Sequence, residues 1–487
     1  MSKRTAIIDI GSNSARLVIY QSTSKNGFHL LCEKKSRVRI GEGAYQNGGN
    51  LQQIGIDRAT NTLESFSQTI NEYKVKKVIA VATSALRDAP NKKDFIDEIK
   101  DRFGIKINVI DGKEEASLGA IAASNLLPVA SGVTIDIGGG SSDMALIKNG
   151  KIVDTYSLDL GTVRLKELFF DKNTEIEIVR EYIQNELDKL PKKFKNAQAI
   201  GIGGTIRSLA KAIISQTGYP LDKLHAFEYK IEDQKNFFKD IVSEKQSNLG
   251  KYGIKENRFD TIREGTLIFL EILKHIGAQR VITSGVGVRE GVYLKSKFPA
   301  PAYRIPKNIN PSIRSIRDRF DMLAFPIGNK KEIAKKLLAL FKNRLKDDID
   351  HRDILYKTLS LSDIGKSLTI YHEQRHASYI AMEELNFGIT HCEALTISLL
   401  LYSKVKRGYN KDMYKKYKTI LPGKNDIKWL SFIYTLTLIL HESSSKAKLV
   451  FNLEKNLLHV KSNKTLYLAK SDVDSLKKPE DIKIVFD

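Results

Sequence analysis

Cysteine is almost absent: only Cys32 and Cys392 occur among 487 residues. Two cysteines exclude a disulfide-rich scaffold and a cysteine-rich zinc site, and they suit a reducing cytosol. The first residues, MSKRTAIIDIGSN, contain no apolar run with a cleavage site, so we expect no secretory signal and a cytoplasmic location. The longest apolar run, near residues 429–440, is too short to span a bilayer and predicts a buried helix rather than a membrane partner.

Two common nucleotide-binding motifs are also missing. No G-x-x-x-x-G-K-[ST] segment occurs, which excludes a P-loop protein. The segment GIGGT, residues 201–205, lacks the third glycine of a dinucleotide-binding fingerprint. Any phosphate site in this chain therefore has another design.

Acidic residues are too few to balance the basic ones. Lys and Arg total 79 and Asp and Glu total 57, which gives a formal net charge of +22. This excess favours an acidic partner, such as a nucleotide, polyphosphate, nucleic acid or anionic lipid. Solvated lysines of a basic protein would give the same excess, so charge alone does not choose among these.

The pattern along the chain changes at two places. Alternating strands and helices run from residue 5 to about 125, and a similar pattern restarts near residues 128–132. Four of the 11 prolines then fall in residues 298–311, which predicts a linker. Amphipathic helices and a small antiparallel sheet follow. We therefore predict three domains, which span residues 1–127, 128–305 and 306–487.

One segment of the first part recurs in the second. AIIDIGSNSARLV, residues 6–18, and TIDIGGGSSDMAL, residues 134–146, each join a buried strand to a second apolar run through a small-residue turn. Asp9 aligns with Asp136 at an offset of 127 without gaps. A strand followed by a glycine-rich turn is common enough to recur by chance. Because each copy opens a similar α/β unit, we predict a duplicated fold.

These two turns carry residue types that suit phosphate and metal. Glycines let backbone N–H groups approach phosphate oxygens, and serine hydroxyls add donors. Aspartate offers the hard oxygen ligand that Mg²⁺ prefers. The candidate phosphate-binding residues are Gly11, Ser12, Asn13, Ser14, Gly138, Gly139, Gly140, Ser141 and Ser142. The candidate metal ligands are Asp9, Asp136 and Asp143.

A wider set of motifs resembles a known family. Six segments stand in order along the chain: AIIDIGSNSARLVIY, VATSALRDAPN, VIDGKEEASLGAIA, TIDIGGGSSDMALI, AIGIGGTIRSLAKA and SGVGVREGVYL. Their order and spacing are similar to those of the exopolyphosphatase and guanosine pentaphosphate phosphohydrolase family, in the actin-like ATPase and sugar kinase superfamily. The resemblance is strong over residues 5 to about 300. It implies an α/β protein with two actin-like (ribonuclease H-like) domains flanking a cleft, followed by a mainly helical HD-like domain with a β tail.

The resemblance also implies a catalytic carboxylate in the EEA motif. In that family a glutamate of this motif activates the attacking water, and here the candidates are Glu115 and, as the alternative, Glu114. Consecutive helical residues point about 100° apart, so only one of the pair can face a given water. Two solvated glutamates at a helix N-terminus would be the ordinary alternative, because the helix dipole favours acids there.

Further residues match the family pattern. Arg87 corresponds to a phosphate-contacting arginine, and Arg16 is a second candidate. Asp143 stands where the family has Glu, so metal contact there would run through water. Two more turns are expected to face phosphate or nucleotide, although tight packing would also select their glycines. Their residues are Gly203, Gly204, Thr205, Gly285, Gly287 and Arg289.

The predicted helical domain departs from the HD pattern. Ser362 stands in place of the dyad histidine beside Asp363, and serine is a poor metal ligand. We therefore expect no second catalytic site. The nearby histidines are expected to pack between helices or lie at the surface, and they are His351, His372, His376 and His391.

Taken with the residues, the resemblance implies a hydrolase of phosphoanhydride bonds that uses Mg²⁺ or another divalent cation. The substrate would be inorganic polyphosphate, guanosine pentaphosphate, which is converted to the tetraphosphate, or both. The resemblance further implies a homodimer. We expect neither a membrane nor a nucleic acid as the partner, and the net charge keeps a nucleic-acid-binding protein as a rival hypothesis. A non-catalytic sensor of alarmone or polyphosphate is the alternative.

Overall fold

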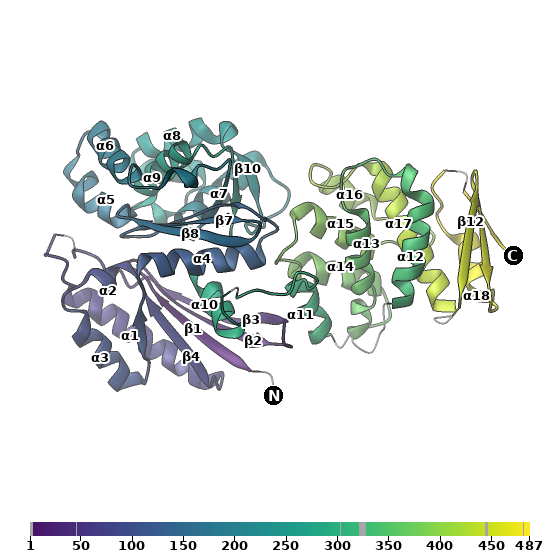
Figure 1. The fold of residues 1–487 in the computed structure, drawn as a ribbon, viewed down its shortest axis with the longest axis horizontal. Coiled ribbons are helices and arrows are strands. Elements are labelled where there is room, and N and C mark those ends of the chain that lie inside the picture. Colours follow the sequence, from purple (N-terminus) through teal and green to yellow (C-terminus); the bar gives the residue numbers. More distant parts are fainter. Residues whose placement is uncertain (1–2, 45, 302, 321–327, 444–446, 481) are drawn as a thin grey trace. The chain divides into compact units, whose positions relative to one another are not determined.

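The computed structural model forms two compact units, Met1–Ile309 and Asn310–Asp487, called here the first and second unit (Figure 1). The described residues are 3–44, 46–301, 303–320, 328–443, 447–480 and 482–487. The first unit contains two β-sheets with helices, and the second is mostly helical with a small sheet at its end. The predicted fold class, α/β followed by a helical region with a β tail, is confirmed.

The two sheets of the first unit share one topology. The first sheet has the order β3-β2-β1-β4-β5, with bounds Phe28–Ser36, Ala15–Ser22, Arg4–Ile10, Lys77–Ala82 and Ile107–Val109. The second has the order β8-β7-β6-β9-β11-β10, with bounds Lys151–Leu158, Ser142–Lys148, Gly132–Ile137, Gln198–Ile202, Arg280–Thr283 and Glu228–Lys230. In each sheet the first three strands in chain order pair antiparallel, and two more strands add in parallel, β4 and β5 in the first sheet and β9 and β11 in the second. The antiparallel β10 extends only the second sheet.

The repeat predicted from the sequence also appears in the strand pairing of the two hairpins, where equivalent residues lie opposite each other. Asp9 lies opposite Arg16 in β1–β2, and Asp136 lies opposite Asp143 in β6–β7. Each turn closes in the same way, because the N–H of Gly11 donates to the carbonyl of Ser14 (3.1 Å), and the corresponding bond in the second turn measures 2.9 Å. The offset of 127 therefore reflects a duplicated structure.

Helices cover both faces of each sheet. The helices of the first unit are α1 Gln53–Glu72, α2 Ser84–Asp88, α3 Lys92–Phe103, α4 Gly112–Leu126, α5 Thr162–Leu168, α6 Ile176–Leu187, α7 Gly203–Thr217, α8 Lys235–Ser243, α9 Ile262–Ile276 and α10 Val288–Lys297. In β7, Met144 joins the core formed with α6 to α9, whereas its neighbour Ala145 faces α4. Strands buried on both faces explain the unbroken apolar runs in the sequence.

Two helices of the first unit, α4 and α10, are exchanged between its halves, because each packs against the half to which it does not belong in sequence. α4 follows the first sheet in sequence but packs against β6, β7 and β8, whereas α10 comes from the second half and packs against α4 and β1 (Figure 1). The Tyr293 ring of α10 lies 4.6 Å from Tyr20 and 4.9 Å from Phe28, measured between ring centroids. The predicted boundary between residues 127 and 128 stays a prediction.

The second unit packs its helices around one core. Its helices are α11 Pro311–Arg319, α12 Gly328–Phe341, α13 His351–Ser360, α14 Glu373–Glu384, α15 His391–Leu401, α16 Lys411–Lys416, α17 Lys424–Ser443 and α18 Tyr467–Ser475. The predicted buried helix at residues 429–440 lies within α17, and Trp429 is fully buried. Among the residues that the structure describes, no helix is long and apolar enough to cross a bilayer.

The terminal sheet differs from the expectation in one strand. β12 Leu449–Glu454 pairs antiparallel with β13 Leu457–Ser462, but β14 Lys483–Phe486 pairs with β13 in parallel. The prediction of an antiparallel sheet was therefore wrong for β14. The physical reason is α18, because a helix between two neighbouring strands returns the chain in its original direction.

Gly291→Ala should destabilise the first unit. A Cβ at Gly291 would lie 2.1 Å from the carbonyl oxygen of Leu118 where α10 crosses α4, so backbone must move. We expect a loss of about 1–3 kcal/mol in the free energy of unfolding, measured in urea. The control is Gly250→Ala, whose Cβ would meet only the Phe259 ring at 3.6 Å. Equal stability of the two variants would contradict close packing at this crossing.

Candidate active site

A cavity of about 370 Å³ lies between the two halves of the first unit. The predicted residues that line it are Asp9, Gly11, Ser12, Asn13, Ser14, Arg16, Glu115, Asp136, Gly138, Gly139, Ser141, Gly203, Gly204, Thr205, Gly287 and Arg289. The two turns of the repeat meet here, since a Cβ on Gly139 would lie 2.8 Å from the Cβ of Ser12. Glycine is required for this approach.

The first turn is held from behind by the segment that follows β3. The carbonyl of Ser12 accepts from the N–H of Gly41, and the carbonyl of Asn13 accepts from the N–H of Arg39, each at 3.0 Å. In a trans peptide the C=O and N–H point in opposite directions. The N–H groups of Asn13 and Ser14 therefore point away from this segment.

The second turn is held in the same way by the start of α5. The N–H groups of Thr162 and Val163 donate to the carbonyls of Gly138 (2.9 Å) and Gly139 (2.8 Å). The next carbonyl, of Gly140, accepts from the Arg164 Nε at 2.9 Å. The N–H groups that follow these carbonyls point away from α5, and the turn lines the cavity. Such converging backbone N–H groups can bind anions.

The turn before α7 packs against the second aspartate. Gly203 has φ of +82°, and a Cβ there would lie 2.2 Å from Asp136 Oδ1. Both the backbone conformation and the approach therefore require glycine. Tight packing, the alternative reason for a glycine in this turn, therefore applies to Gly203. Gly203, Gly204 and Thr205 also line the cavity.

The EEA motif places only one of its glutamates at the cavity. Asp111 caps α4 by accepting from the N–H of Glu114 (2.7 Å), which fixes the helix start. The Glu115 side chain is 13% exposed and lies 3.4 Å from Arg87 Nη1. Glu114 is 41% exposed and pairs with Lys295 Nζ at 2.6 Å. Glu115 alone of the two can reach a molecule in the cavity.

Four carboxylates crowd this region. Burial raises the pKa of Glu115 well above its usual range, repulsion from Asp143 and Asp136 adds to this, and Arg87 opposes it. Burial also raises the pKa of Asp136 to about 6 and that of Asp143 to about 7. The pKa of Asp9 rises for the same reason, against the attraction of Arg289 and Arg16. A cation in the cavity would stabilise these groups in their charged form.

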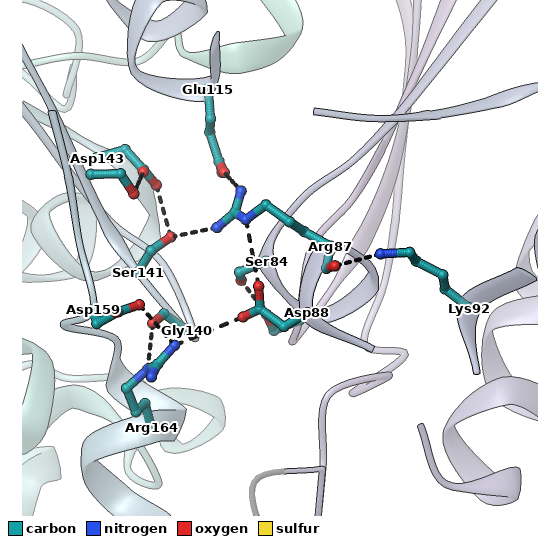
Figure 2. Close-up of polar contacts among 12 residues, drawn as sticks. Ser84, Arg87, Asp88, Lys92, Glu115, Gly140, Ser141, Asp143, Asp159 and Arg164 are labelled. Carbon is teal, nitrogen blue, oxygen red and sulfur yellow. Dashed lines mark hydrogen bonds and ion pairs between the residues drawn. The ribbon is translucent and has the colours of Figure 1, made fainter. Parts of the chain in front are cut away.

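Arg87 lies between Glu115 and Ser141 (Figure 2), and it is not among the residues that line the cavity. Its Nη1 donates to the carbonyl of Ile110 (3.2 Å), and its Nη2 donates to Ser141 Oγ (3.5 Å). Ser141 in turn donates to Asp143 Oδ2 at 3.0 Å. Arg87 thus links Glu115 to the second turn, and a phosphate contact by Arg87 stays a prediction.

The donor set fits a divalent cation that shares its coordination with phosphate. Among the described residues no three His, Cys, Asp or Glu side chains gather as a metal site. Mg²⁺ usually takes one or two carboxylates and completes its shell with substrate phosphates and water. Asp9 and Asp136 line the cavity and could serve. Asp143 is 2% exposed and accepts from Ser141 and from Ser157 (2.6 Å), so it lies behind them.

Four further basic residues line the cavity, although no sequence motif marks them as site residues. They are Lys35, Arg37, Arg207 and Arg258. Together with Arg16 and Arg289 they give the cavity six basic side chains against three acidic ones. Burial and the neighbouring Arg16 and Arg258 lower the pKa of Lys35 to about 8. Of these four, Arg207 could have been predicted from a local pattern. It stands four residues after Gly203 on α7, so both lie on the same face of the helix.

Other predicted residues lie outside the cavity lining. Gly140 and Ser142 are both buried, and Ser142 Oγ donates to the carbonyl of Leu160 at 2.6 Å. Gly285 packs against His225. These positions support the turns from behind.

In the second unit, the ammonium group of Lys330 lies against Ser362 and Asp363, the two residues at the positions of the HD dyad. Lys330 Nζ donates to Asp363 Oδ2 (2.5 Å) and to Ser362 Oγ (3.0 Å), and Lys366 donates to Asp363 Oδ1 (2.9 Å). The carboxylate is thus neutralised by lysines. His351 bonds to Asp426 at 2.7 Å.

Comparisons with known proteins match this fold and site. The sequence profile of the Ppx/GppA phosphatase family matches residues 18–297. A bifunctional 3-dehydroquinate synthase/phosphatase of Fusobacterium nucleatum is 31% identical over 301 residues, which are 57% of this chain and 44% of that protein. The chain thus spans less than half the length of this relative.

Two crystal structures extend the likeness to three dimensions. A Ppx/GppA family member of Aquifex aeolicus is 30% identical, with a TM-score of 0.52 over 60% of this chain and 97% of that one. An exopolyphosphatase of Cytophaga hutchinsonii is 27% identical, with a TM-score of 0.56 over 61% of this chain and 98% of that one. These findings confirm the resemblance predicted from the six motifs.

Asp143→Asn should flatten the pH dependence of stability in EDTA. Because folding raises the Asp143 pKa from 3.8 to about 7, its contribution to stability is present below pH 3.8 and is lost as pH rises through about 7. Between pH 5 and 8 we expect the wild-type free energy of unfolding in urea to fall by about 1 kcal/mol or more relative to the variant.

The control for this experiment is Asp154→Asn. The pKa of Asp154 is lowered by its hydrogen bond from Lys193, so this group does not titrate in that pH range. Parallel stability curves for the wild type and Asp143→Asn would contradict the raised pKa.

Proposed function

Because the chain belongs to the Ppx/GppA phosphatase family, we propose that its first unit hydrolyses phosphoanhydride bonds and releases the terminal phosphate of inorganic polyphosphate. The observation that carries the proposal is the position of Glu115 at a cavity lined by two anion-binding turns and six basic side chains. Such a cavity suits a substrate made of phosphates. The relatives named a phosphatase and an exopolyphosphatase support it further.

Glu115 is the proposed general base. A base is most effective when its pKa lies near the working pH, and burial moves the Glu115 pKa in that direction. Its ion pair with Arg87 fixes the carboxylate on the cavity side of α4. In this scheme Glu115 orients a water molecule and accepts its proton as the water attacks the terminal phosphorus.

The remaining groups stabilise charge. Phosphoryl transfer depends mostly on positioning and on electrostatic stabilisation of the phosphate oxygens. The N–H groups of both turns would bind these oxygens, and the basic wall would hold the rest of the chain. Mg²⁺ or another divalent cation, held by Asp9 and Asp136, would neutralise part of the phosphate charge.

Polyphosphate fits the cavity lining better than guanosine pentaphosphate does. The apolar side chains among the lining residues are Ile137, Ile202 and Val288, and no aromatic ring is among them. A guanine base usually stacks on such a ring, whereas a phosphate chain needs only cations and N–H donors. Guanosine pentaphosphate remains the second candidate. The relatives give no support to a non-catalytic sensor, and the expected homodimer and cytoplasmic location stay predictions.

Glu115→Gln should lower kcat for phosphate release from polyphosphate by about 10²–10⁴-fold, because the amide cannot accept the proton. Binding of polyphosphate, measured by calorimetry, should persist. The control is Glu114→Gln, which removes only an exposed pair with Lys295 and should keep kcat within about twofold. If Glu115→Gln keeps full turnover, another group is the base.

A side-by-side assay should separate the two substrates. We expect kcat/KM for long polyphosphate to exceed that for guanosine pentaphosphate by about tenfold or more, equivalent to about 1.4 kcal/mol. Both substrates would be assayed with Mg²⁺ and again with excess EDTA, which should abolish release. A higher kcat/KM for the nucleotide would overturn the polyphosphate assignment but not the hydrolase assignment.

A further inference from the structure

One carboxylate lies between two arginines beside the cavity (Figure 2). Asp88 Oδ1 is 3.6 Å from Arg87 Nε, and Asp88 Oδ2 is 3.8 Å from Arg164 Nη2. Asp88 ends α2, beside the first sheet, whereas Arg164 lies in α5, beside the second. The contact therefore joins the two halves of the first unit.

Arg164 also has partners within its own half. Its Nε donates to the carbonyl of Gly140 (2.9 Å), and its Nη2 pairs with Asp159 Oδ1 (3.1 Å). Its side chain is 18% exposed. One planar guanidinium thus holds the end of the second turn and a carboxylate from the other half, which a lysine ammonium could not do with the same geometry.

We propose that Arg164 is a positioning residue for hydrolysis, which fixes the Gly140 carbonyl and, through Asp88, the guanidinium of Arg87. The proposal rests on the function proposed above. Arg87 contacts Glu115 and Ser141, so its orientation affects both the base and the second turn. Arg164 is not among the residues that line the cavity, so it acts through other groups.

The contacts predict what happens without Arg164. The carbonyl of Gly140 would lose its donor, and the peptide that carries the N–H of Ser141 could rotate. Asp88 would keep Arg87 as its nearest cation and draw it away from Glu115 and Ser141. Both changes misplace groups that act on the transferred phosphate, and misplacement by about 1 Å can cost about 10²-fold in rate.

The first test compares Arg164→Ala with Arg164→Lys and Arg180→Ala. Arg164→Ala should lower kcat for polyphosphate by about 10- to 100-fold with a smaller change in KM. Arg164→Lys keeps the charge near Asp88 and should recover part of kcat. Arg180 pairs with Glu271 at 3.0 Å and does not line the cavity, so Arg180→Ala should leave kcat unchanged. Equal kcat values for Arg164→Ala and wild type would overturn the proposal.

A double-mutant cycle tests the route through Asp88. If Arg164 acts on Arg87 through Asp88, the double variant Arg164→Ala/Asp88→Asn should lose little more kcat than the more impaired single variant. Full additivity of the two losses would show that Arg164 does not act through Asp88. Thermal unfolding of each variant separates a loss of folded protein from a loss of kcat.

A crystal structure of Arg164→Ala decides the inference independently of activity. Displacement of the Arg87 guanidinium from Ser141 or rotation of the Gly140 peptide would support it, and an unchanged arrangement would overturn it. If the wild type releases no phosphate from polyphosphate or guanosine pentaphosphate, the proposed function fails. The positions of Arg87 and Gly140 in the variant still settle whether Arg164 positions them.

Discussion

The N–H groups of the two turns can converge on an anion, as proposed, only because other segments hold the carbonyl oxygens of the same peptides. Residues 39–41 bond the carbonyls of the first turn, and residues 162–164 bond those of the second. A free turn could rotate its peptides and present oxygen, which repels phosphate. The motif residues therefore supply small size and hydroxyl groups, whereas the direction of the N–H groups comes from segments whose sequences carry no phosphate-binding signature.

The same cavity concentrates charge of both signs. Repulsion from Asp136 adds to the raised pKa of Asp143, and repulsion from both aspartates adds to the raised pKa of Glu115. Burying such groups costs folding free energy, and six basic side chains at the cavity offset only part of it. This cost is consistent with a site arranged for an anionic substrate and its counter-cation rather than for stability.

The parts of the site that could be predicted are those that a short stretch of sequence encodes. The two turns with Asp9 and Asp136 follow from a gap-free repeat of apolar strand and glycine-rich turn, and the helical phase of α4 separates Glu115 from Glu114. Lys35 reaches the cavity from β3 and Arg258 reaches it from the short 3-10 helix Glu256–Arg258, two segments that lie far from the motifs in sequence. No local pattern encodes that approach, nor the lysine that meets Asp363 in the second unit. These depend on tertiary packing.

The exchange of α4 and α10 has a consequence for synthesis of the protein. Tyr20 and Phe28 precede α10 in the chain, and both end buried against Tyr293 of α10. Their partner is translated more than 260 residues later, so the first sheet keeps an uncovered apolar face for most of that time. Neither half of the duplicated core can be completed co-translationally on its own.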